Sequence, residues 1–359
     1  MLNQVMKNSA LCAKVHAMRG RFLKKSDYDA MMNMKSVPDV AGYLIEHTRY
    51  SRALKGTSAA QIHRGALEQF LREDLKTDIN SLMPYMSYGA KKFAELTEIE
   101  EGISILKICL RLLGGGHSRE VPEYLKKLKA TGTVDKMGSV DGIESIDMLV
   151  DRLAETPYYA ALKVFSSNPD KQKPFYMEMR LDTYWTKLVF KYLNKYLTGG
   201  EKSSIRKLYG TEFDLENLTF LLRCKKSFDM TDEEIYTCLI PLYYRLKEET
   251  VTHIVDAQSY DDALEIIESE TPYGAAFSKE DRFIEKRERE FILHLFARAY
   301  STNQYSVLSP VDYLYRRRAE IDNIISVTEG IRYGLSPERI KDYLINTDLT
   351  KSGKGGTDV

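Results

Sequence analysis

The chain of 359 residues is long enough for two or three domains. An apolar fraction of 43%, with 11% aromatic residues, is typical of a globular protein and excludes an intrinsically disordered chain. Because 52 basic residues balance 52 acidic residues, the net charge gives no reason to expect a nucleic acid or an anionic membrane surface as partner.

The N-terminal segment, residues 1–23, is mildly apolar, but Lys7, Lys14, His16 and Arg19 interrupt any signal-peptide core. Elsewhere no run approaches the roughly 18–20 apolar residues that a membrane-spanning helix needs. We therefore expect the chain to stay in the cytoplasm.

The four cysteines are scattered along the chain and form no Cys-x-x-Cys pair: they are Cys12, Cys109, Cys224 and Cys238. This usage predicts reduced, packed thiols, because a disulfide framework or a zinc site requires cysteines at closer and more regular spacings.

A heptamer recurs three times, as TRYSRAL at 48–54, TPYYAAL at 156–162 and TPYGAAF at 271–277. A second string comes after each copy, as EIEEGISILK at 98–107, DLENLTFLLR at 214–223 and EIDNIISVTE at 320–329. The same order at similar spacing predicts an internal repeat that runs the length of the chain.

Segments with helical periodicity lie between the two strings of each repeat, within 62–71, 181–196 and 284–299. Their apolar residues recur three, four or seven positions apart, which is typical of amphipathic helices that bury one face. The sequence therefore predicts an all-α protein of three related helical units, 1–130, 131–255 and 256–345, with a disordered tail at 346–359.

The heptamer has the pattern of a helix start. Thr156 and Thr271 each precede a proline, as a cap residue precedes a proline in the first helical turn. The tyrosine and the Leu or Phe of each heptamer are four residues apart and share one helix face. We interpret the heptamer as a helix-start and core-anchor module used once in each unit.

The second string carries an acidic residue three positions before an asparagine, in Asp214 with Asn217 and in Glu320 with Asn323. Asp214 is predicted to cap the start of a helix, where a carboxylate also interacts favourably with the helix dipole. These carboxylates could instead be ligands or acid–base groups. We favour the structural role, because a residue repeated in every unit serves the fold that the units share.

Other helix boundaries are marked by local signals. Thr231 with Glu234 forms a capping box, and Ser336 precedes Pro337 at a helix start. The glycines at 114–116 are typical of a helix end.

No catalytic or metal-binding motif is present. The six histidines form no His-Glu-x-x-His pattern, and GGEKSS at 199–204 lacks the order of a phosphate-binding loop. No Gly-x-Ser-x-Gly elbow occurs, and carboxylates are too widespread for a catalytic pair to be singled out. We expect no catalysis, no cofactor, no metal and no small-molecule substrate.

Three consecutive arginines, Arg316, Arg317 and Arg318, form the most concentrated charge in the chain. Neighbouring residues on a helix point in different directions, so at least one should face another unit or a partner. Arginine is enriched at interface anchors. A solvated helix with ion pairs inside the chain is the equally open alternative.

Four segments, 10–32, 42–54, 214–228 and 309–340, resemble the C subunit of the bacterial and archaeal V-type (A-type) ATPases, a relative of the d subunit of V-ATPases. The similarity spans about residues 5–345. The first unit departs most, with Glu98 and Glu101 in place of the acid–asparagine pair.

This resemblance implies a funnel of three similar helical bundles with approximate threefold symmetry. It implies a non-catalytic adaptor at the cytoplasmic face of the cell membrane. Such an adaptor links the central-stalk subunits D and F to the membrane rotor ring of K/c subunits through protein contacts, and transmits torque for proton or sodium transport. The arginines 316–318 would then be candidates for the stalk interface. A generic helical-repeat scaffold is the alternative, although such scaffolds usually have shorter repeats and one continuous concave surface.

Overall fold

The computed structural model describes residues 2–54, 56–134, 137–165, 173–227, 230–279, 281–302, 305 and 308–347. Throughout these ranges the chain forms α-helices, short 3₁₀ helices and connections, and no strand occurs in them. The all-α prediction is confirmed. None of the helices within these ranges has the length and apolar character that spanning a bilayer requires.

The chain forms two compact units. The terminal unit combines residues 1–87 with 267–359, so both ends of the chain belong to it, and the central unit is residues 88–266. The predicted division into 1–130, 131–255 and 256–345 stays a prediction, as does the threefold symmetry. Of the predicted tail, 346–359, the part from residue 348 onward lies outside the described residues.

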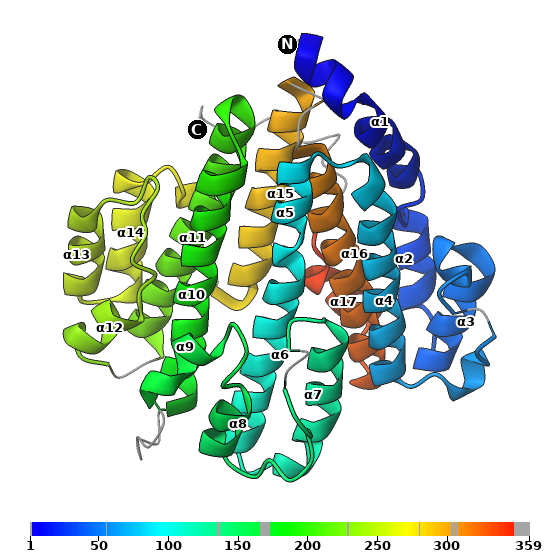
Figure 1. Ribbon diagram of the computed structural model, residues 1–359, viewed down its shortest axis with the longest axis horizontal. Coiled ribbons are helices and arrows are strands. Elements are labelled where there is room, and N and C mark those ends of the chain that lie inside the picture. Colours follow the sequence, from blue (N-terminus) through cyan, green and yellow to red (C-terminus); the bar gives the residue numbers. More distant parts are fainter. Residues whose placement is uncertain are drawn as a thin grey trace. The chain divides into compact units, whose positions relative to one another are not determined.

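The terminal unit is built from helices of both ends of the chain (Figure 1). Its α-helices are α1 (Leu2–Arg19), α2 (Lys25–Met32), α3 (Val37–His47), α4 (Arg64–Leu82), α15 (Ile284–Thr302), α16 (Leu308–Arg332) and α17 (Pro337–Tyr343). Its 3₁₀ helices are η1 (Arg49–Ser51), η2 (Ala59–Gln61), η3 (Met83–Tyr85), η6 (Gly274–Ala276) and η7 (Asp281–Phe283).

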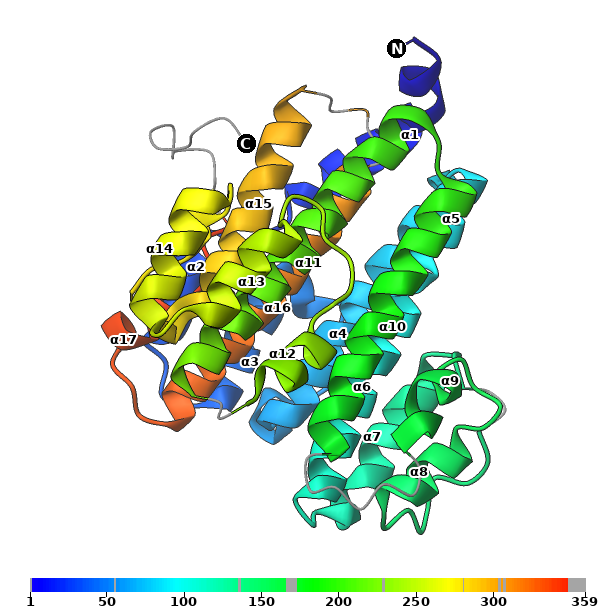
Figure 2. The ribbon, with the colours of Figure 1, turned by 90° about the vertical axis from the view of Figure 1, so that its left-hand side faces the viewer.

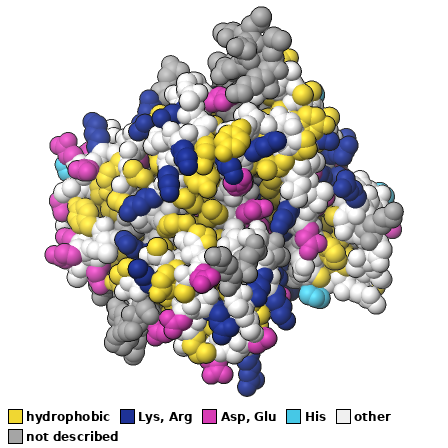
Figure 3. Space-filling view, in the orientation of Figure 1, with side chains coloured by type: hydrophobic (Ala, Val, Ile, Leu, Met, Phe, Trp, Pro, Cys, Tyr) yellow, Lys and Arg dark blue, Asp and Glu magenta, His cyan; other side chains and the backbone are white. Residues whose placement is uncertain are grey.

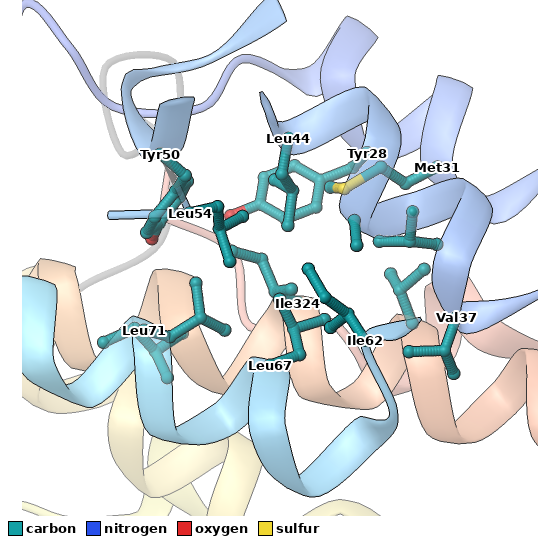
Figure 4. Close-up of a cluster of buried hydrophobic side chains, with 14 of the residues drawn as sticks. Tyr28, Met31, Val37, Leu44, Tyr50, Leu54, Ile62, Leu67, Leu71 and Ile324 are labelled. Carbon is teal, nitrogen blue, oxygen red and sulfur yellow. The ribbon is translucent and has the colours of Figure 1, made fainter. Parts of the chain in front are cut away.

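Helix α16 is the centre of the terminal unit, and it packs against α1, α4 and α15. Buried residues occur all round its circumference, as expected for a helix enclosed by others. A cluster of apolar side chains from α2, α3 and α4 surrounds Ile324 of α16, and Tyr50, Leu54 and Ile62 from the connection between α3 and α4 complete it (Figure 4). The N-terminal helices are therefore held by a helix from the other end of the chain.

The central unit contains α5 (Tyr88–Ala94), α6 (Leu96–Gly114), α7 (Val121–Ala130), α8 (Ile146–Arg152), α9 (Tyr159–Leu162), α10 (Lys173–Tyr196), α11 (Gly199–Lys226), α12 (Asp232–Cys238) and α13 (Glu248–Asp256). Two 3₁₀ helices, η4 (Ser118–Glu120) and η5 (Lys163–Phe165), belong to it as well. Helix α14 (Tyr260–Glu270) crosses from the central unit into the terminal unit.

Helix α10 organises the central unit by packing against α5, α6, α9 and α11. Figure 2 shows α7, α8 and α9 gathered at one end of α6 and α10. Helix α11, like α16, buries residues on all sides, including Leu208, Phe213 and Asp214, which point in three different directions. The second strings of the last two repeats thus lie in the central helices of their units.

Several predicted helix boundaries are confirmed. The Thr231 hydroxyl accepts from the Glu234 N–H at 3.3 Å, and the Glu234 carboxylate accepts from the Thr231 N–H at 2.9 Å, so a capping box begins α12. The Ser336 hydroxyl accepts from the Arg339 N–H at the start of α17, where Pro337 is the first helical residue. Helix α6 ends at Gly114, as the glycine run predicts.

All four cysteines are free and buried, as predicted. Burial raises the pKa of Cys109 and of Cys224 to about 12. Because the thiolate is the reactive form, these side chains behave as small apolar residues.

On the face shown in Figure 3, basic and acidic side chains of the described residues are interspersed, in keeping with the balanced charge of the chain.

Candidate functional site

The predicted helix-start residues lie in the middle of long helices. Helix α11 begins at Gly199, well before Asp214 and Asn217, and α16 begins at Leu308, well before Glu320 and Asn323. The prediction that Asp214 caps the start of its own helix is therefore wrong. The chain before Asp214 continues as helix because its apolar residues are buried in the unit, and tertiary packing outweighs a local capping preference.

Asp214 caps a different segment. Its carboxylate is fully buried and accepts from three successive backbone N–H groups: Tyr244 at 2.9 Å, Arg245 at 2.7 Å and Leu246 at 3.1 Å. These groups belong to the connection that leads into α13. A buried carboxylate that takes several hydrogen bonds from one segment fixes the path of that segment, because a buried charge is costly without its hydrogen bonds.

The two asparagines form equivalent clamps. Asn217 accepts from the Ile240 N–H at 2.8 Å and donates to the Ile240 carbonyl at 3.0 Å. Asn323 accepts from the Ile345 N–H at 2.7 Å and donates to the Ile345 carbonyl at 2.9 Å. Only a carboxamide supplies a donor and an acceptor in this arrangement. The repeat thus holds one residue of the returning chain at the same place on both central helices.

The threonines of the heptamers close the preceding helical segment. Thr271 donates to the Ile267 carbonyl at 2.7 Å, and Thr156 donates to the Leu153 carbonyl at 2.7 Å. The next helical segment is the single turn of α9 after Thr156 and the 3₁₀ helix η6 after Thr271. The predicted helix start is therefore corrected to a turn that ends one helix and leads into a short one.

The heptamer tyrosines are core anchors, as predicted. Tyr50, Tyr158 and Tyr273 are all 0% exposed. The Tyr158 hydroxyl lies 2.8 Å from the Thr133 hydroxyl and donates to the Ile99 carbonyl of α6. It rests directly against Gly102, where an added Cβ would lie 2.0 Å from the hydroxyl oxygen. The heptamer of the second repeat thus docks on the second string of the first.

The heptamer of the first repeat docks on the second string of the third repeat, residues 320–329. The Tyr50 hydroxyl donates to Glu320 Oε1 of α16 at 2.9 Å. This contact joins the N-terminal part of the chain to α16, in keeping with the residues from both chain ends that form one compact unit.

An ionic cluster surrounds this contact, made by Arg49, Asp74, Asp78, Arg317 and Glu320 with the hydroxyls of Tyr50 and Tyr313. Its centre is Arg317 of α16, whose side chain is 0% exposed. Arg317 donates from Nη2 to Asp74 Oδ2 at 2.7 Å and from Nε to Asp78 Oδ2 at 3.0 Å. Its Nη1 donates to Glu320 Oε1 and to the Tyr50 hydroxyl.

The second arginine repeats this pattern. Arg49 Nη1 donates to the Tyr313 hydroxyl at 2.9 Å, and that hydroxyl donates to Asp78 Oδ2 at 2.6 Å. Arg49 Nη2 also contacts both carboxylate oxygens of Asp78 at 2.7 Å. Each arginine therefore reaches a carboxylate both directly and through a tyrosine hydroxyl. Charge-assisted bonds of this kind are the strongest in proteins.

Two arginines face three carboxylates in the cluster. The remaining negative charge is met by neutral donors, since Glu320 Oε2 accepts from the Leu23 N–H at 2.6 Å. Burial raises the pKa of Glu320 and of Asp74, although the guanidinium of Arg317 lowers both. Burial lowers the pKa of Arg317, but Tyr50, Glu320 and the other groups around it raise it well above its ordinary value. The charges are thus stabilised by each other instead of by water.

The three consecutive arginines have different surroundings. Arg317 has no exposed surface, so the prediction that it belongs to a stalk interface is wrong. Arg316 is half-buried and donates to Asp312 Oδ1 at 2.9 Å and to the Thr347 carbonyl at 2.7 Å. Arg318 is half-buried. The interface role of Arg316 and Arg318 stays a prediction.

The ionic cluster was not predicted from the sequence, although the sequence of α4 carries a signal for it. Asp74 and Asp78 continue the stripe of Leu67 and Leu71 on the buried face of α4. Two carboxylates on an apolar stripe require a buried cation, and Arg317 supplies it from the other end of the chain. No set of His, Cys, Asp or Glu side chains within the described ranges is placed to hold a metal ion.

Comparison with known proteins identifies the family. The ATP synthase (C/AC39) subunit family matches residues 11–343. The chain is 25% identical to the C subunit of the A-type ATP synthase of Methanosarcina mazei over 345 residues, which is 92% of this chain and 91% of that protein.

Other relatives match over the same extent. The C subunit of the A-type ATP synthase of Archaeoglobus fulgidus is 23% identical, over 93% of this chain and 95% of that protein. The corresponding protein of Methanocaldococcus jannaschii is 22% identical, over 93% and 85%. The chain belongs to the ATP synthase (C/AC39) subunit family, whose members are non-catalytic subunits of the V-type and A-type ATPase complexes.

Proposed function

We propose that this protein is the adaptor of the central stalk in a rotary ATPase. It links stalk subunits D and F to the membrane rotor ring of K/c subunits and transmits torque between ATP turnover and proton or sodium transport. It would lie at the cytoplasmic face of the membrane and be held there by protein contacts. The observation that carries the proposal is the family match, which extends over residues 11–343 and so covers both compact units.

The construction of the terminal unit suits a part that bears load. Helices α2, α3 and α4 are joined to α16 by the buried apolar cluster, α4 is joined to it also by the ionic cluster around Arg317, and α1 packs against α16 directly. A force applied to one chain end therefore passes directly to the other end. A transmission element needs this stiffness, because an element that deforms stores the torque instead of transmitting it.

Omission of the subunit from the complex tests the proposal. A complex assembled without it should still hydrolyse ATP in its head, but ion translocation by vesicles carrying the complex should be lost. Adding back the purified chain should restore coupling. Ion transport that persists at the normal rate without the subunit would contradict the proposed role and favour the alternative of an accessory helical scaffold.

A second test concerns contacts. Among the three arginines, Arg316 and Arg318 remain the candidates for the stalk interface. Replacing both with alanine should weaken retention of subunits D and F in a pull-down, with a smaller difference at high salt because exposed ion pairs are screened. The Arg332→Ala variant, on the exposed end of the same helix, is the control. Unchanged retention would remove both arginines from the interface.

A further inference from the structure

A group of three tyrosines, one exposed and two half-buried, lies in the central unit where α10 ends beside the start of α5. We call it the aromatic corner and define it as Tyr88, Tyr192 and Tyr196 with Lys92 and Lys195. The Tyr88 side chain is 70% exposed. Its ring meets the Tyr196 ring edge-on at 6.1 Å, and the Tyr192 and Tyr196 rings lie 5.2 Å apart. Figure 2 shows α5 and α10 side by side.

The aromatic corner is held rigidly from below. A Cβ added to Gly89 would lie 2.3 Å from the Tyr196 carbonyl oxygen, so only glycine allows α5 to approach the end of α10 this closely. One turn further, the buried Phe93 ring packs against the Tyr209 ring at 5.6 Å. Tyr88 therefore projects from a fixed base, and the backbone of the corner loses little conformational entropy when a partner covers it.

The two segments that carry the aromatic corner have a net positive charge. Across 88–95 and 188–197 the charged residues are four lysines and one glutamate, Glu95. The Lys195 ammonium lies 5.0 Å from the centre of the Tyr196 ring, and Lys92 is bonded to Glu95 at 2.8 Å. A partner that covers the corner would meet an excess of positive charge, which favours an acidic surface.

The rings of the corner are tyrosines, with Tyr88 exposed and Tyr192 and Tyr196 half-buried, and this favours a protein over a lipid surface. Tyrosine is enriched at protein interfaces because its ring supplies apolar area and its hydroxyl finds a hydrogen-bond partner. Insertion into a bilayer relies on apolar side chains such as Leu, Phe and Trp on the contacting face. At the corner, Leu193 and Leu197 are buried instead.

We infer that the aromatic corner is a preorganised docking surface for an acidic segment of a protein partner. The choice of partner rests on the proposed function: it is the central stalk of subunits D and F. The rings of Tyr88 and Tyr196 form the apolar contact, and Lys195 pairs with a carboxylate of the stalk.

The experiment measures binding of the purified complex of subunits D and F to the full chain. Tyr88→Ala should weaken binding about tenfold or more, as expected for an aromatic anchor. Lys195→Glu should weaken it similarly and should reduce its dependence on salt. Tyr88→Phe, which keeps the ring, should stay close to wild type. Tyr236→Ala is the matched control, because Tyr236 is an exposed tyrosine (44%) of the same unit.

The outcomes separate the two proposals. Wild-type chain that does not bind the stalk would overturn the proposed function and, with it, this partner. Normal stalk binding by both Tyr88→Ala and Lys195→Glu would overturn the docking surface alone. Binding of the wild type to phosphatidylglycerol vesicles that Tyr88→Ala abolishes, with stalk binding intact, would replace the protein partner with a membrane surface. Thermal melting of each variant should match wild type, since Tyr88 is exposed.

Discussion

Arg317 Nε lies 3.0 Å from Asp78 Oδ2, although 239 positions separate the two residues in the chain. This contact joins α16 to α4 across the terminal unit. Around it, the ionic cluster is buried, since Arg317 is 0% and Glu320 is 2% exposed. The contribution of the cluster to stability depends on all of its members, because a buried ion pair stabilises a fold only while every charge has its partner.

Removal of the central cation should therefore destabilise the terminal unit strongly. Arg317→Met leaves Asp74, Asp78 and Glu320 with too little positive charge, and should lower the free energy of unfolding by about 3–5 kcal/mol. Arg332→Met is the control on the same helix, because Arg332 forms an exposed pair with Glu329 and should cost under about 1 kcal/mol. Urea denaturation measures both. Equal costs would show that the cluster contributes no more than a surface pair.

Glu320 should give the terminal unit an unusual dependence on pH. Its pKa in the folded state is raised above the ordinary value of 4.5, so the folded state binds this proton more tightly than the unfolded state does. The stability that it contributes is then fully present below pH 4.5 and is lost as the pH rises through the folded pKa. Relative to Glu320→Gln, the wild type should become less stable from acidic to neutral pH.

Glu338 supplies the control of opposite sign. Hydrogen bonds from its own backbone N–H and from Ser336 lower its pKa, so its contribution is present above the unfolded pKa and is lost as the pH falls. Urea denaturation of wild type, Glu320→Gln and Glu338→Gln at several pH values makes the comparison. A wild-type advantage over Glu320→Gln that grows with pH would contradict the expected sign.

Asp214 should matter more than an ordinary helix cap. Asp214→Ala removes a charged acceptor from three backbone N–H groups, and hydrogen bonds to charged groups contribute about 1.5–3 kcal/mol each, although they are not additive. We expect a loss above the upper end for a cap, about 2 kcal/mol. Hydrogen exchange should become faster at Tyr244, Arg245 and Leu246.

The control is Glu216→Ala, because Glu216 is exposed on the same helix. Local protection of the three N–H groups that survives in Asp214→Ala would show that another acceptor replaces the carboxylate. A fully stable Asp214→Ala that no longer assembles with subunits D and F would place the residue at an interface.

Gly102 should be intolerant of any side chain. An alanine Cβ would lie 2.0 Å from the Tyr158 hydroxyl and 2.8 Å from the ring carbon that carries it. Overpacking of this kind costs about 1–3 kcal/mol. Tyr158→Phe removes the oxygen, so the double variant should recover part of the loss seen in Gly102→Ala.

This coupling is measured by a double-mutant cycle of unfolding free energies. The matched control is Gly116→Ala, where no atom lies within 4 Å of the added Cβ and the cost comes only from the positive φ of 78°. Independent, additive effects of Gly102→Ala and Tyr158→Phe would mean that the two residues do not share one packing site.

The features that could be predicted from the sequence are those with local causes. Helical periodicity, the capping box of Thr231 and Glu234, and the Ser336–Pro337 helix start involve residues within a turn of one another, so their interactions are present in the sequence pattern. The burial of Tyr50, Tyr158 and Tyr273 was likewise predictable, because an aromatic residue repeated with an apolar residue four positions later indicates a core. The family was recognisable as well, since the order and spacing of its motifs survive in the chain.

The surroundings of the polar residues, in contrast, depend on contacts between distant parts of the chain. Arg317 and Asp214 are charged and have local patterns that suit a surface and a helix start, yet both are 0% exposed. Their partners, Asp74 and Asp78 for one and the backbone of 244–246 for the other, lie far along the chain. Whether a charge is buried depends on whether distant residues desolvate it and supply its opposite, and no window of neighbouring residues contains that information.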